Sequence, residues 1–233
     1  MTVLKRMIWL LLSVCLLLVP FDVRASADKP LDVYYHVPTT EKVVALTFDD
    51  GPHPRFTDEI LGILEKEKIR ATFFVIGSNV ETYPAVVQRV IAAGHEIGNH
   101  TYRHPIVNTV TDEQLEEEIN KTDAILREIG YSGNNLFRPP QGKCSKTMPA
   151  LLERTNKTTI LWNIDTRDWT HRPSEEIVDE IKNHVCGGDI ILLHDYVSGE
   201  STTIPALKKL IPMLKEQGYQ FVTVSELLSL KDS

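Results

Sequence analysis

Two adjacent carboxylates, Asp49 and Asp50, follow an apolar run and precede a Gly-Pro pair in the segment TFDDGP. Glycine followed by proline turns the chain sharply, so both acids are expected where a strand ends. Adjacent like charges repel each other unless a cation or a hydrogen-bond network holds them. The pair therefore has two interpretations, an acidic turn of the kind that often ends a strand or part of a reactive site.

Two histidines, His100 and His104, lie four residues apart in the segment HTYRH. On a helical turn this spacing points both imidazoles in one direction, where they could share a metal ion. A pair of surface histidines is the alternative, and the zinc metalloprotease signature is excluded because no glutamate follows the first histidine. Together with Asp50, the histidines would form a set of metal ligands that leaves positions open for water and substrate. Asp49 would then be free to act as a base.

Further groups that could complete such a site stand later in the chain. Arg138 begins the rigid segment RPPQG, where its guanidinium could orient a carboxylate or form a structural salt bridge. His194 ends an apolar run, and it is either a structural histidine or a general acid opposite the metal. The segment DTRDW adds Asp165, Asp168 and the large aromatic Trp169.

Short apolar runs alternate with longer segments of helical period, which predicts about seven βα units around a mainly parallel sheet. The predicted strands are 43–48, 71–76, 95–98, 136–138, 159–164, 189–193 and 219–223. The predicted helices are 57–68, 83–93, 112–129, 146–156, 174–185 and 204–217, with a short one near 226–231. Nearly every reactive group stands at or just after the C-terminal end of a strand. In a parallel α/β barrel these ends share one face, so the groups are expected to converge there.

The first 27 residues have the pattern of a secretory signal peptide. Lys5 and Arg6 precede an uncharged apolar run, and Ala25-Ser26-Ala27 matches an A-x-A cleavage site. The run has about 13 residues, whereas a bilayer span needs roughly 20. Cleavage is therefore expected, with an uncleaved membrane anchor as the alternative. The expected organisation is a signal peptide at 1–27, a leader at 28–42 and one folded domain at 43–233, secreted or held at the cell surface.

The overall composition is that of an ordinary globular protein. The chain has 233 residues, of which 42% are hydrophobic and 24% charged, which suits one domain and excludes a disordered or fibrous chain. The net charge of −7 disfavours nucleic acid, because phosphate binding requires clustered Lys and Arg, whereas neutral glycans remain acceptable partners. Cys144 and Cys186 are too few for a disulfide framework, and whether they pair is left open.

Considered together, the motifs resemble those of the polysaccharide deacetylase family, also called carbohydrate esterase family 4. Five motifs occur in the order of that family: TFDDGP at 47–52, HTYRHP at 100–105, RPPQG at 138–142, DTRDW at 165–169 and LLH at 192–194. The resemblance implies a distorted (β/α) barrel with about seven parallel strands. It also implies a divalent metal, commonly zinc with cobalt or nickel as alternatives, and hydrolysis of N-acetyl groups on N-acetylglucosamine polymers.

The resemblance also implies a role for each matching residue. The implied metal ligands are Asp50, His100 and His104. The implied base is Asp49, oriented by Arg138, and the implied acid is His194, tuned by Asp168. Trp169 and Leu192 would form the walls of the acetyl pocket. The family often has an aromatic residue where this chain has Gln141. The backbone N–H of Gln141 would still stabilise the oxyanion, so this departure concerns the wall of a sugar subsite.

The expected activity is metal-dependent removal of N-acetyl groups from an amino-sugar polysaccharide. Cell-wall peptidoglycan N-acetylglucosamine is the first choice of substrate, because the leader indicates secretion. The alternatives are a chitin oligosaccharide deacetylase, an acetylxylan O-acetyl esterase and an inactive protein that binds wall glycan. A non-haem iron oxygenase shares the ligand set, but the neighbouring Asp49 and the opposing His194 suit hydrolysis better. A serine hydrolase is disfavoured because the G-x-S-x-G elbow does not occur.

Overall fold

The structure, a computed structural model, describes residues 33–133 and 135–232. The predicted signal peptide at 1–27 and the first part of the predicted leader lie outside the described residues. Within the described ranges, no helix has both the length and the apolar character that crossing a bilayer requires.

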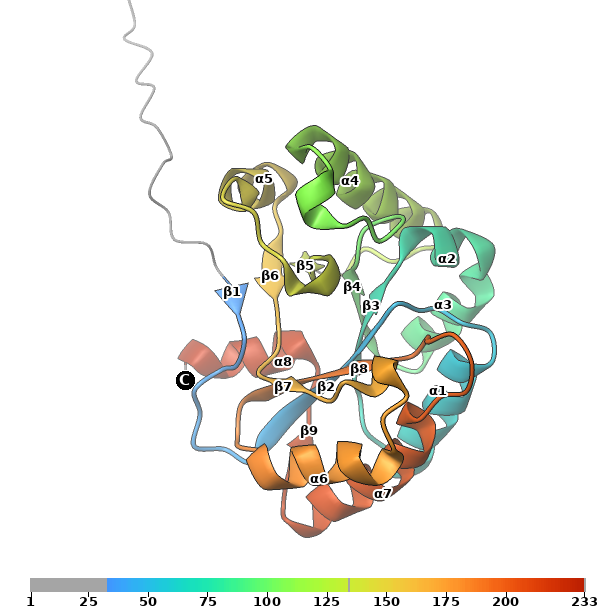
Figure 1. The fold of residues 1–233 in the computed structure, drawn as a ribbon, viewed down its shortest axis with the longest axis vertical. Helices are drawn as coiled ribbons and strands as arrows, with labels where there is room; N and C mark the ends of the chain where they lie inside the picture. Colours follow the sequence, from blue (N-terminus) through green and yellow to red (C-terminus); the bar gives the residue numbers. More distant parts are fainter. Residues whose placement is uncertain (1–32, 134, 233) are drawn as a thin grey trace, which may run out of the picture.

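The fold is built on a curled sheet in which neighbouring strands run parallel (Figure 1). In spatial order its strands are β1 (Val33–Tyr34), β6 (Thr158–Ile160), β5 (Leu136–Phe137), β4 (Glu96–Asn99), β3 (Thr72–Val75), β2 (Val43–Asp49), β8 (Asp189–His194) and β7 (Ile164–Asp165). A ninth strand, β9 (Gln220–Phe221), lies off this path and pairs with β2. The predicted distorted (β/α) barrel is confirmed. Because β1 precedes residue 43, the packed unit begins within the predicted leader.

The predicted strand 159–164 is two strands in the structure. β6 pairs with β5 and β1, whereas β7 pairs with β8 at the other end of the sheet order. Between them, the N–H of Leu161 donates to the carbonyl of Tyr34, and the N–H of Asn163 donates to the carbonyl of Ile190. One continuous strand cannot form hydrogen bonds with β1 and β5 and also with β8, which lies near the other end of the sheet order. The chain therefore bends at Trp162, between β6 and β7. This break, with the short β1, raises the strand number from the expected seven to nine in the described residues.

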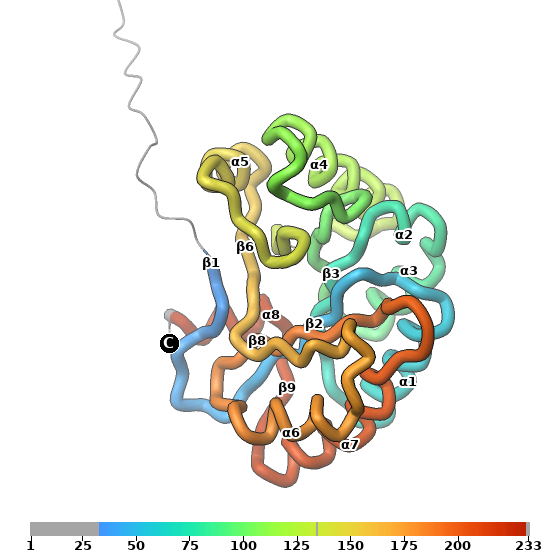
Figure 2. Tube along the Cα trace, in the orientation of Figure 1, coloured from blue at the N-terminus to red at the C-terminus, as the bar shows by residue number. Residues whose placement is uncertain are grey.

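Helices surround the sheet, and several begin at the capping signals present in the sequence (Figures 1 and 2). They are α1 (Phe56–Glu67), α2 (Gly77–Thr82), α3 (Pro84–Ala92), α4 (Asp112–Glu128), α5 (Met148–Thr155), α6 (Ser174–His184), α7 (Thr203–Glu216) and α8 (Val224–Ser229). Thr111 and Gln114 form the capping box expected at the start of α4. The short α2 was not predicted, and Pro84 separates it from α3 by occupying the first position of that helix.

Strand β2 lies inside the sheet between β3 and β8, and all of its residues are buried. Val44, Leu46 and Phe48 belong to the large core between sheet and helices, whereas Val43 and Ala45 pack inside the barrel against α8. Successive side chains of a strand point to opposite faces. Thr47 and Asp49 therefore continue the inward-facing series, which explains how the end of β2 delivers a carboxylate to the barrel interior.

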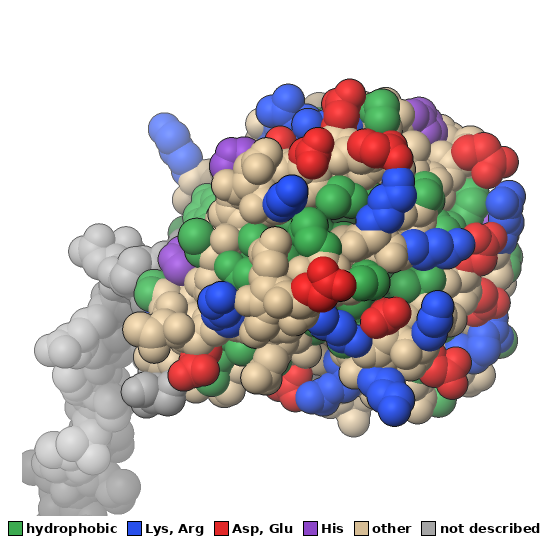
Figure 3. Space-filling view, turned by 90° about the horizontal axis from the view of Figure 1, so that it is seen from below, with side chains coloured by type: hydrophobic (Ala, Val, Ile, Leu, Met, Phe, Trp, Pro, Cys, Tyr) green, Lys and Arg blue, Asp and Glu red, His purple; other side chains and the backbone are tan. Residues whose placement is uncertain are grey.

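Charged side chains of both signs are interspersed on the face of the molecule seen from below (Figure 3). Among the exposed ion pairs, Arg89 pairs with Asp58 at 2.7 Å and Arg154 pairs with Glu116 at 2.9 Å. Exposed pairs of this kind contribute little to stability.

Candidate active site

A pocket of about 410 Å³ opens where β2 and β8 end, on the face where the reactive groups were expected to converge. It is lined by carboxylates, imidazoles and two tryptophans: Asp49, Asp50, His100, His104, Gln141, Trp162, Asp165, Trp169, Leu192 and His194. The two remaining predicted residues, Arg138 and Asp168, are fully buried and contact the pocket wall. The structure therefore brings all of the predicted site residues together.

Asp50, His100 and His104 form a group whose potential ligand atoms all lie within 4.8 Å of one another. Oδ1 of Asp50 lies 3.5 Å from Nε2 of His100 and 3.6 Å from Nε2 of His104. Ligands about 2.0–2.2 Å from a tetrahedral zinc ion lie roughly 3.3–3.6 Å apart. Moreover, Oδ1 of Asp50 is buried and has no hydrogen-bond partner among the described residues. An orphaned carboxylate oxygen beside two imidazoles fits a divalent metal site.

Neighbouring groups orient the members of this set and influence their protonation. Nδ1 of His100 lies 2.7 Å from the carbonyl of Arg138, and because a carbonyl only accepts, Nδ1 carries a proton and Nε2 is the nitrogen that faces Asp50. Burial lowers the pKa of His100, but Asp49 and Asp50 outweigh it and raise the pKa, so a bound metal would take the place of a proton on Nε2.

Burial raises the pKa of Asp50, but His100, His194 and His104 outweigh it and lower the pKa to about 2. The carboxylate is therefore ionised. Burial and the neighbouring His100 lower the pKa of His104, which favours the neutral imidazole that a metal requires.

The two histidines do converge, but the expectation that a helical turn brings them together is wrong. The segment that carries them is irregular, and Thr101 and His104 have left-handed backbones with φ of 68° and 53°. Asp50 and Gln141 are also left-handed, at 74° and 60°. Such conformations cost about 1–3 kcal/mol each and persist only where the surroundings hold them. Loop geometry imposed by tertiary contacts therefore sets the spacing of the two imidazoles.

Asp49 is held by a buried arginine through only one of its oxygens. NH1 of Arg138 donates to Oδ1 of Asp49 at 2.6 Å and to Oγ1 of Thr47 at 2.9 Å. The other nitrogens of Arg138 donate to the carbonyls of Ile160 and Leu161, so the guanidinium has a fixed orientation. Oδ2 of Asp49 lies 3.7 Å from Nε2 of His100. One carboxylate oxygen is thus fixed, and the other lies beside His100 of the candidate metal site.

His194 is held by Asp168, which is fully buried. Nδ1 of His194 lies 2.7 Å from Oδ1 of Asp168, and Oδ2 of Asp168 accepts hydrogen bonds from the backbone N–H of His194 and from Oγ1 of Thr203. Burial alone would lower the pKa of His194, but Asp168, followed by Asp49 and Asp50, raises it to about 9. His194 is therefore a protonated donor at neutral pH.

The two acids of the segment DTRDW have different places. Asp168 contacts His194, whereas Asp165 lines the pocket and accepts the backbone N–H of Arg167 through Oδ1 at 3.0 Å. Trp169 follows Asp168 and remains 55% exposed, while Leu192 is buried. An exposed aromatic beside a buried aliphatic residue provides an apolar wall next to the polar groups.

Trp162 also lines the pocket and was missed from the sequence. It lies in the bend between β6 and β7, which the single predicted strand concealed. A Cβ on Gly142 would stand 2.7 Å from the Trp162 ring, so only glycine fits there. Arg138 lies 5.4 Å from the centre of the same ring. Trp162 therefore joins the RPPQG segment to the pocket wall.

Asp195 is a second residue whose place could not be foreseen. It is buried, its Oδ2 accepts from Oγ1 of Thr57 at 2.6 Å, and its Oδ1 has no hydrogen-bond partner among the described residues. Burial, with Asp50 and Asp49 nearby, raises the pKa of Asp195 to about 7. A Cβ on Gly51 would overlap this carboxylate, which explains why the turn after Asp50 contains glycine.

Comparisons with known proteins identify relatives over most of the chain. The polysaccharide deacetylase family model matches residues 36–160. A peptidoglycan-N-acetylglucosamine deacetylase of Bacillus cereus is 42% identical over 201 residues, which cover 85% of this chain and 94% of the relative.

Two solved structures have the same fold at 35% identity. One is a peptidoglycan N-acetylglucosamine deacetylase in complex with an N-hydroxybenzamide, with a TM-score of 0.81 over 84% of this chain and 92% of that chain. The other is a family 4 acetyl xylan esterase from Clostridium thermocellum in complex with a cobalt ion. Its TM-score is 0.76 over 82% of this chain and 92% of that chain.

Proposed function

We propose that this chain, which belongs to the polysaccharide deacetylase family, removes N-acetyl groups from the N-acetylglucosamine units of peptidoglycan by metal-dependent hydrolysis. The proposal rests on the groups that meet in one pocket. Three possible metal ligands lie there beside Asp49, which Arg138 holds, and His194, which the buried Asp168 holds. This set supplies a base, an acid and a metal site, as hydrolysis of an amide requires.

Asp49 is proposed as the base. Arg138 occupies Oδ1, so Oδ2 is the oxygen that takes a proton from the attacking water. When bound at Asp50, His100 and His104, a divalent metal acts as a Lewis acid toward the acetyl carbonyl and lowers the pKa of a coordinated water. Because the carboxylate is fixed before the substrate arrives, little reorganisation is needed during proton transfer.

His194 is proposed as the acid. Attack of water on the acetyl carbon breaks the C–N bond only if the leaving nitrogen is protonated, and His194 holds the required proton because Asp168 raises its pKa. The backbone N–H of Gln141 donates to the developing oxyanion. Trp169 and Leu192 enclose the acetyl methyl group. The products are acetate and a free amine on the sugar.

Zinc is the proposed metal. Two imidazoles and one carboxylate are a common catalytic zinc set, with open positions for water and substrate. The cobalt ion in the acetyl xylan esterase supports a divalent metal in this fold, and cobalt or nickel are alternatives. Elemental analysis of purified protein, followed by chelation and reloading with each ion, tests the identity. Loss of activity on chelation that no divalent ion restores would contradict the proposed metal role.

The substrate proposal rests on the relatives named as peptidoglycan N-acetylglucosamine deacetylases. The acetyl xylan esterase of the same fold makes an ester of acetylxylan the second candidate. Metal-loaded protein should be incubated with muropeptides, chitin oligomers and acetylxylan, while acetate is measured enzymatically and products by mass spectrometry. Fragmentation then assigns the free amine to glucosamine or muramic acid. Acetate from acetylxylan alone would overturn the peptidoglycan assignment.

Secretion of the chain is also proposed. Residues 1–27 have the signal-peptide pattern, which would place the folded domain outside the cell, where wall polysaccharide is accessible. N-terminal sequencing of protein recovered from the medium and from the membrane fraction tests this. A mature N-terminus near residue 28 is expected, whereas a membrane fraction that begins at Met1 would indicate a retained anchor.

A further inference from the structure

The turn that carries His100 and His104 is strained, and specific contacts must hold it. Thr101 and His104 have left-handed backbones, which residues with a side chain rarely adopt without support. The N–H of Gly77 donates to the carbonyl of Thr101 at 2.9 Å, and the N–H of His104 donates to Oγ1 of Thr101 at 3.1 Å. One further contact comes from the side chain of Asn99, the last residue of β4.

Asn99 connects this turn to helix α4. Its Oδ1 accepts the backbone N–H of Thr101 at 2.8 Å, while its Nδ2 donates to the carbonyl of Ile119 at 2.9 Å and to Oδ1 of Asp123 at 2.7 Å. Asn99 is 1% exposed, and these protein groups are the partners of its side-chain amide. Two acceptors for Nδ2 decide which way the amide faces, because the reversed amide would point N–H groups at the N–H of Thr101.

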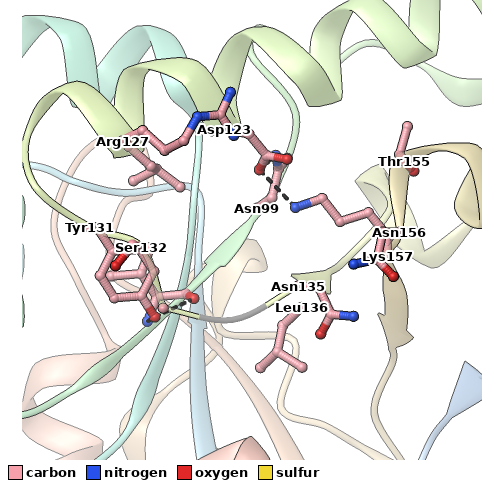
Figure 4. Close-up of a pocket in the computed structure, with 13 residues that line it drawn as sticks. Asn99, Asp123, Arg127, Tyr131, Ser132, Asn135, Leu136, Thr155, Asn156 and Lys157 are labelled. Carbon is pink, nitrogen blue, oxygen red and sulfur yellow. Dashed lines mark hydrogen bonds and ion pairs between the residues drawn. The ribbon is translucent and has the colours of Figure 1, made fainter.

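Asp123 is held in turn by Lys157. Nζ of Lys157 donates to Oδ1 of Asp123 at 2.7 Å, and the Lys157 side chain is 5% exposed. Figure 4 shows Lys157 reaching across a pocket of about 280 Å³ toward Asp123, with Asn99 beside the carboxylate. The Asp123 side chain is 19% exposed, so the contact is only partly shielded from solvent. A charge-assisted hydrogen bond from Lys157 orients the carboxylate and holds Asp123 in place as the acceptor for Asn99.

We propose that Asn99 and Asp123 are positioning residues for the metal-ligand pair His100 and His104. The hydrogen bonds run from Lys157 through Asp123 and Asn99 to the N–H of Thr101, which lies between the two ligands. Asn99 also fixes the strand end directly, because its own carbonyl accepts the N–H of Arg138, whose carbonyl orients His100. The inference rests on the proposed metal role of these histidines and extends it to residues outside the pocket.

The first test is the Asn99→Asp variant. It replaces the side-chain amide, which donates to Asp123, with a carboxylate that Asp123 repels. Zinc affinity is measured by competition with a chromophoric chelator, and ligand geometry by the visible absorption of the cobalt-loaded protein. We expect the dissociation constant for zinc to rise about 10- to 100-fold, the usual effect of removing a partner of a metal ligand. The cobalt spectrum should change as well. An unchanged dissociation constant and spectrum would overturn the proposal.

The Asn99→Asp, Asp123→Asn double variant is the conservative rescue. In this variant the new amide at position 123 can donate to the new carboxylate at position 99, and an oxygen of that carboxylate remains to accept the N–H of Thr101. We expect it to recover most of the zinc affinity lost in the single variant, which a purely destructive effect on the fold would not allow. If Asn99→Asp does not fold, Lys157→Met serves as the test, because the open pocket beside Lys157 accommodates the methionine. Wild-type zinc affinity in a folded Lys157→Met variant would also overturn the proposal.

A matched control is Thr72 of β3, which contacts the opposite end of β4. Oγ1 of Thr72 donates to the buried Glu96, which begins β4, and accepts the N–H of Val224. Thr72→Val should lower the melting temperature of the metal-free protein while leaving the zinc dissociation constant unchanged. If the wild-type protein binds no metal, the proposed function fails. If the wild type and the Asn99 variant bind zinc equally, only the present inference fails.

Discussion

Asp49 and His194 are direct partners in the parallel register of β2 and β8. These residues are 145 positions apart in the chain, yet each is the last residue of its strand. Because partnered ends of parallel strands lie side by side, the sheet places the proposed base next to the proposed acid without help from a flexible loop. Arg138 then fixes Asp49 and Asp168 fixes His194, each from a buried position.

Asp49→Asn should retain the metal and lose turnover. The asparagine oxygen can still accept from Arg138, and Asp50, His100 and His104 are unchanged. Loss of a general base typically lowers the rate by about 10²- to 10⁴-fold. Steady-state acetate release and zinc content, measured on the same preparation, check the prediction. Wild-type turnover in the variant would contradict the role of Asp49.

Activity should fall at high pH as His194 loses its proton. The pKa of His194 is raised to about 9, so the protonated acid is available below that value and kcat/KM should decline above it. Asp168→Asn removes the main group that raises the pKa. The decline should then begin closer to the ordinary histidine value of 6.5. A pH profile of kcat/KM for both proteins decides this, and identical high-pH limbs would show that His194 is not the titrating acid.

Gly51→Ala should damage the turn that carries Asp50. The new Cβ would overlap the buried Asp195 carboxylate, and such overpacking typically costs about 1–3 kcal/mol of stability. Gly62→Ala is the matched control, because Gly62 lies in α1 with nothing within 4 Å of an added Cβ. It should gain up to about 1 kcal/mol from helix propensity. Equal free energies of unfolding for the two variants, from urea titration, would contradict the predicted overlap.

Zinc should raise the melting temperature, and magnesium should not. A ligand that binds only the folded state at 100 times its dissociation constant adds about 2.7 kcal/mol of stability. Magnesium prefers an octahedron of oxygen ligands, which two imidazoles cannot supply. His104→Ala removes one ligand and should abolish most of the zinc effect. Thermal denaturation of both proteins with each ion is the measurement, and a zinc-induced rise that persists in His104→Ala would contradict the ligand assignment.

The sequence predicted the barrel and the convergence of the site because both follow from local patterns. Asp49 and His194 each end an apolar run, and strand ends of a parallel sheet share a face. Features that depend on tertiary partners were not predictable. The bend at Trp162 arises because β6 and β7 pair with opposite ends of the sheet order, and no local signal marks that change.

The site shows the same division between local signals and tertiary contacts. The four-residue spacing of His100 and His104 indicated a shared metal, but a helical turn was the wrong reason. Left-handed residues create the spacing, and it is supported by three residues that are far apart in the sequence, Asn99, Asp123 and Lys157. Each of these three residues taken alone resembles an ordinary polar position. Only their contacts reveal the arrangement.

Metal-dependent deacetylation of peptidoglycan N-acetylglucosamine can be tested in a single experiment on muropeptides. Muropeptides are incubated with chelated protein, with zinc-reloaded protein and with zinc-reloaded Asp49→Asn, and the products are fragmented by mass spectrometry. The account predicts loss of acetyl groups from glucosamine with the reloaded wild type, and little or none with the other two. Unmodified muropeptides after incubation with folded, zinc-loaded wild type would contradict it.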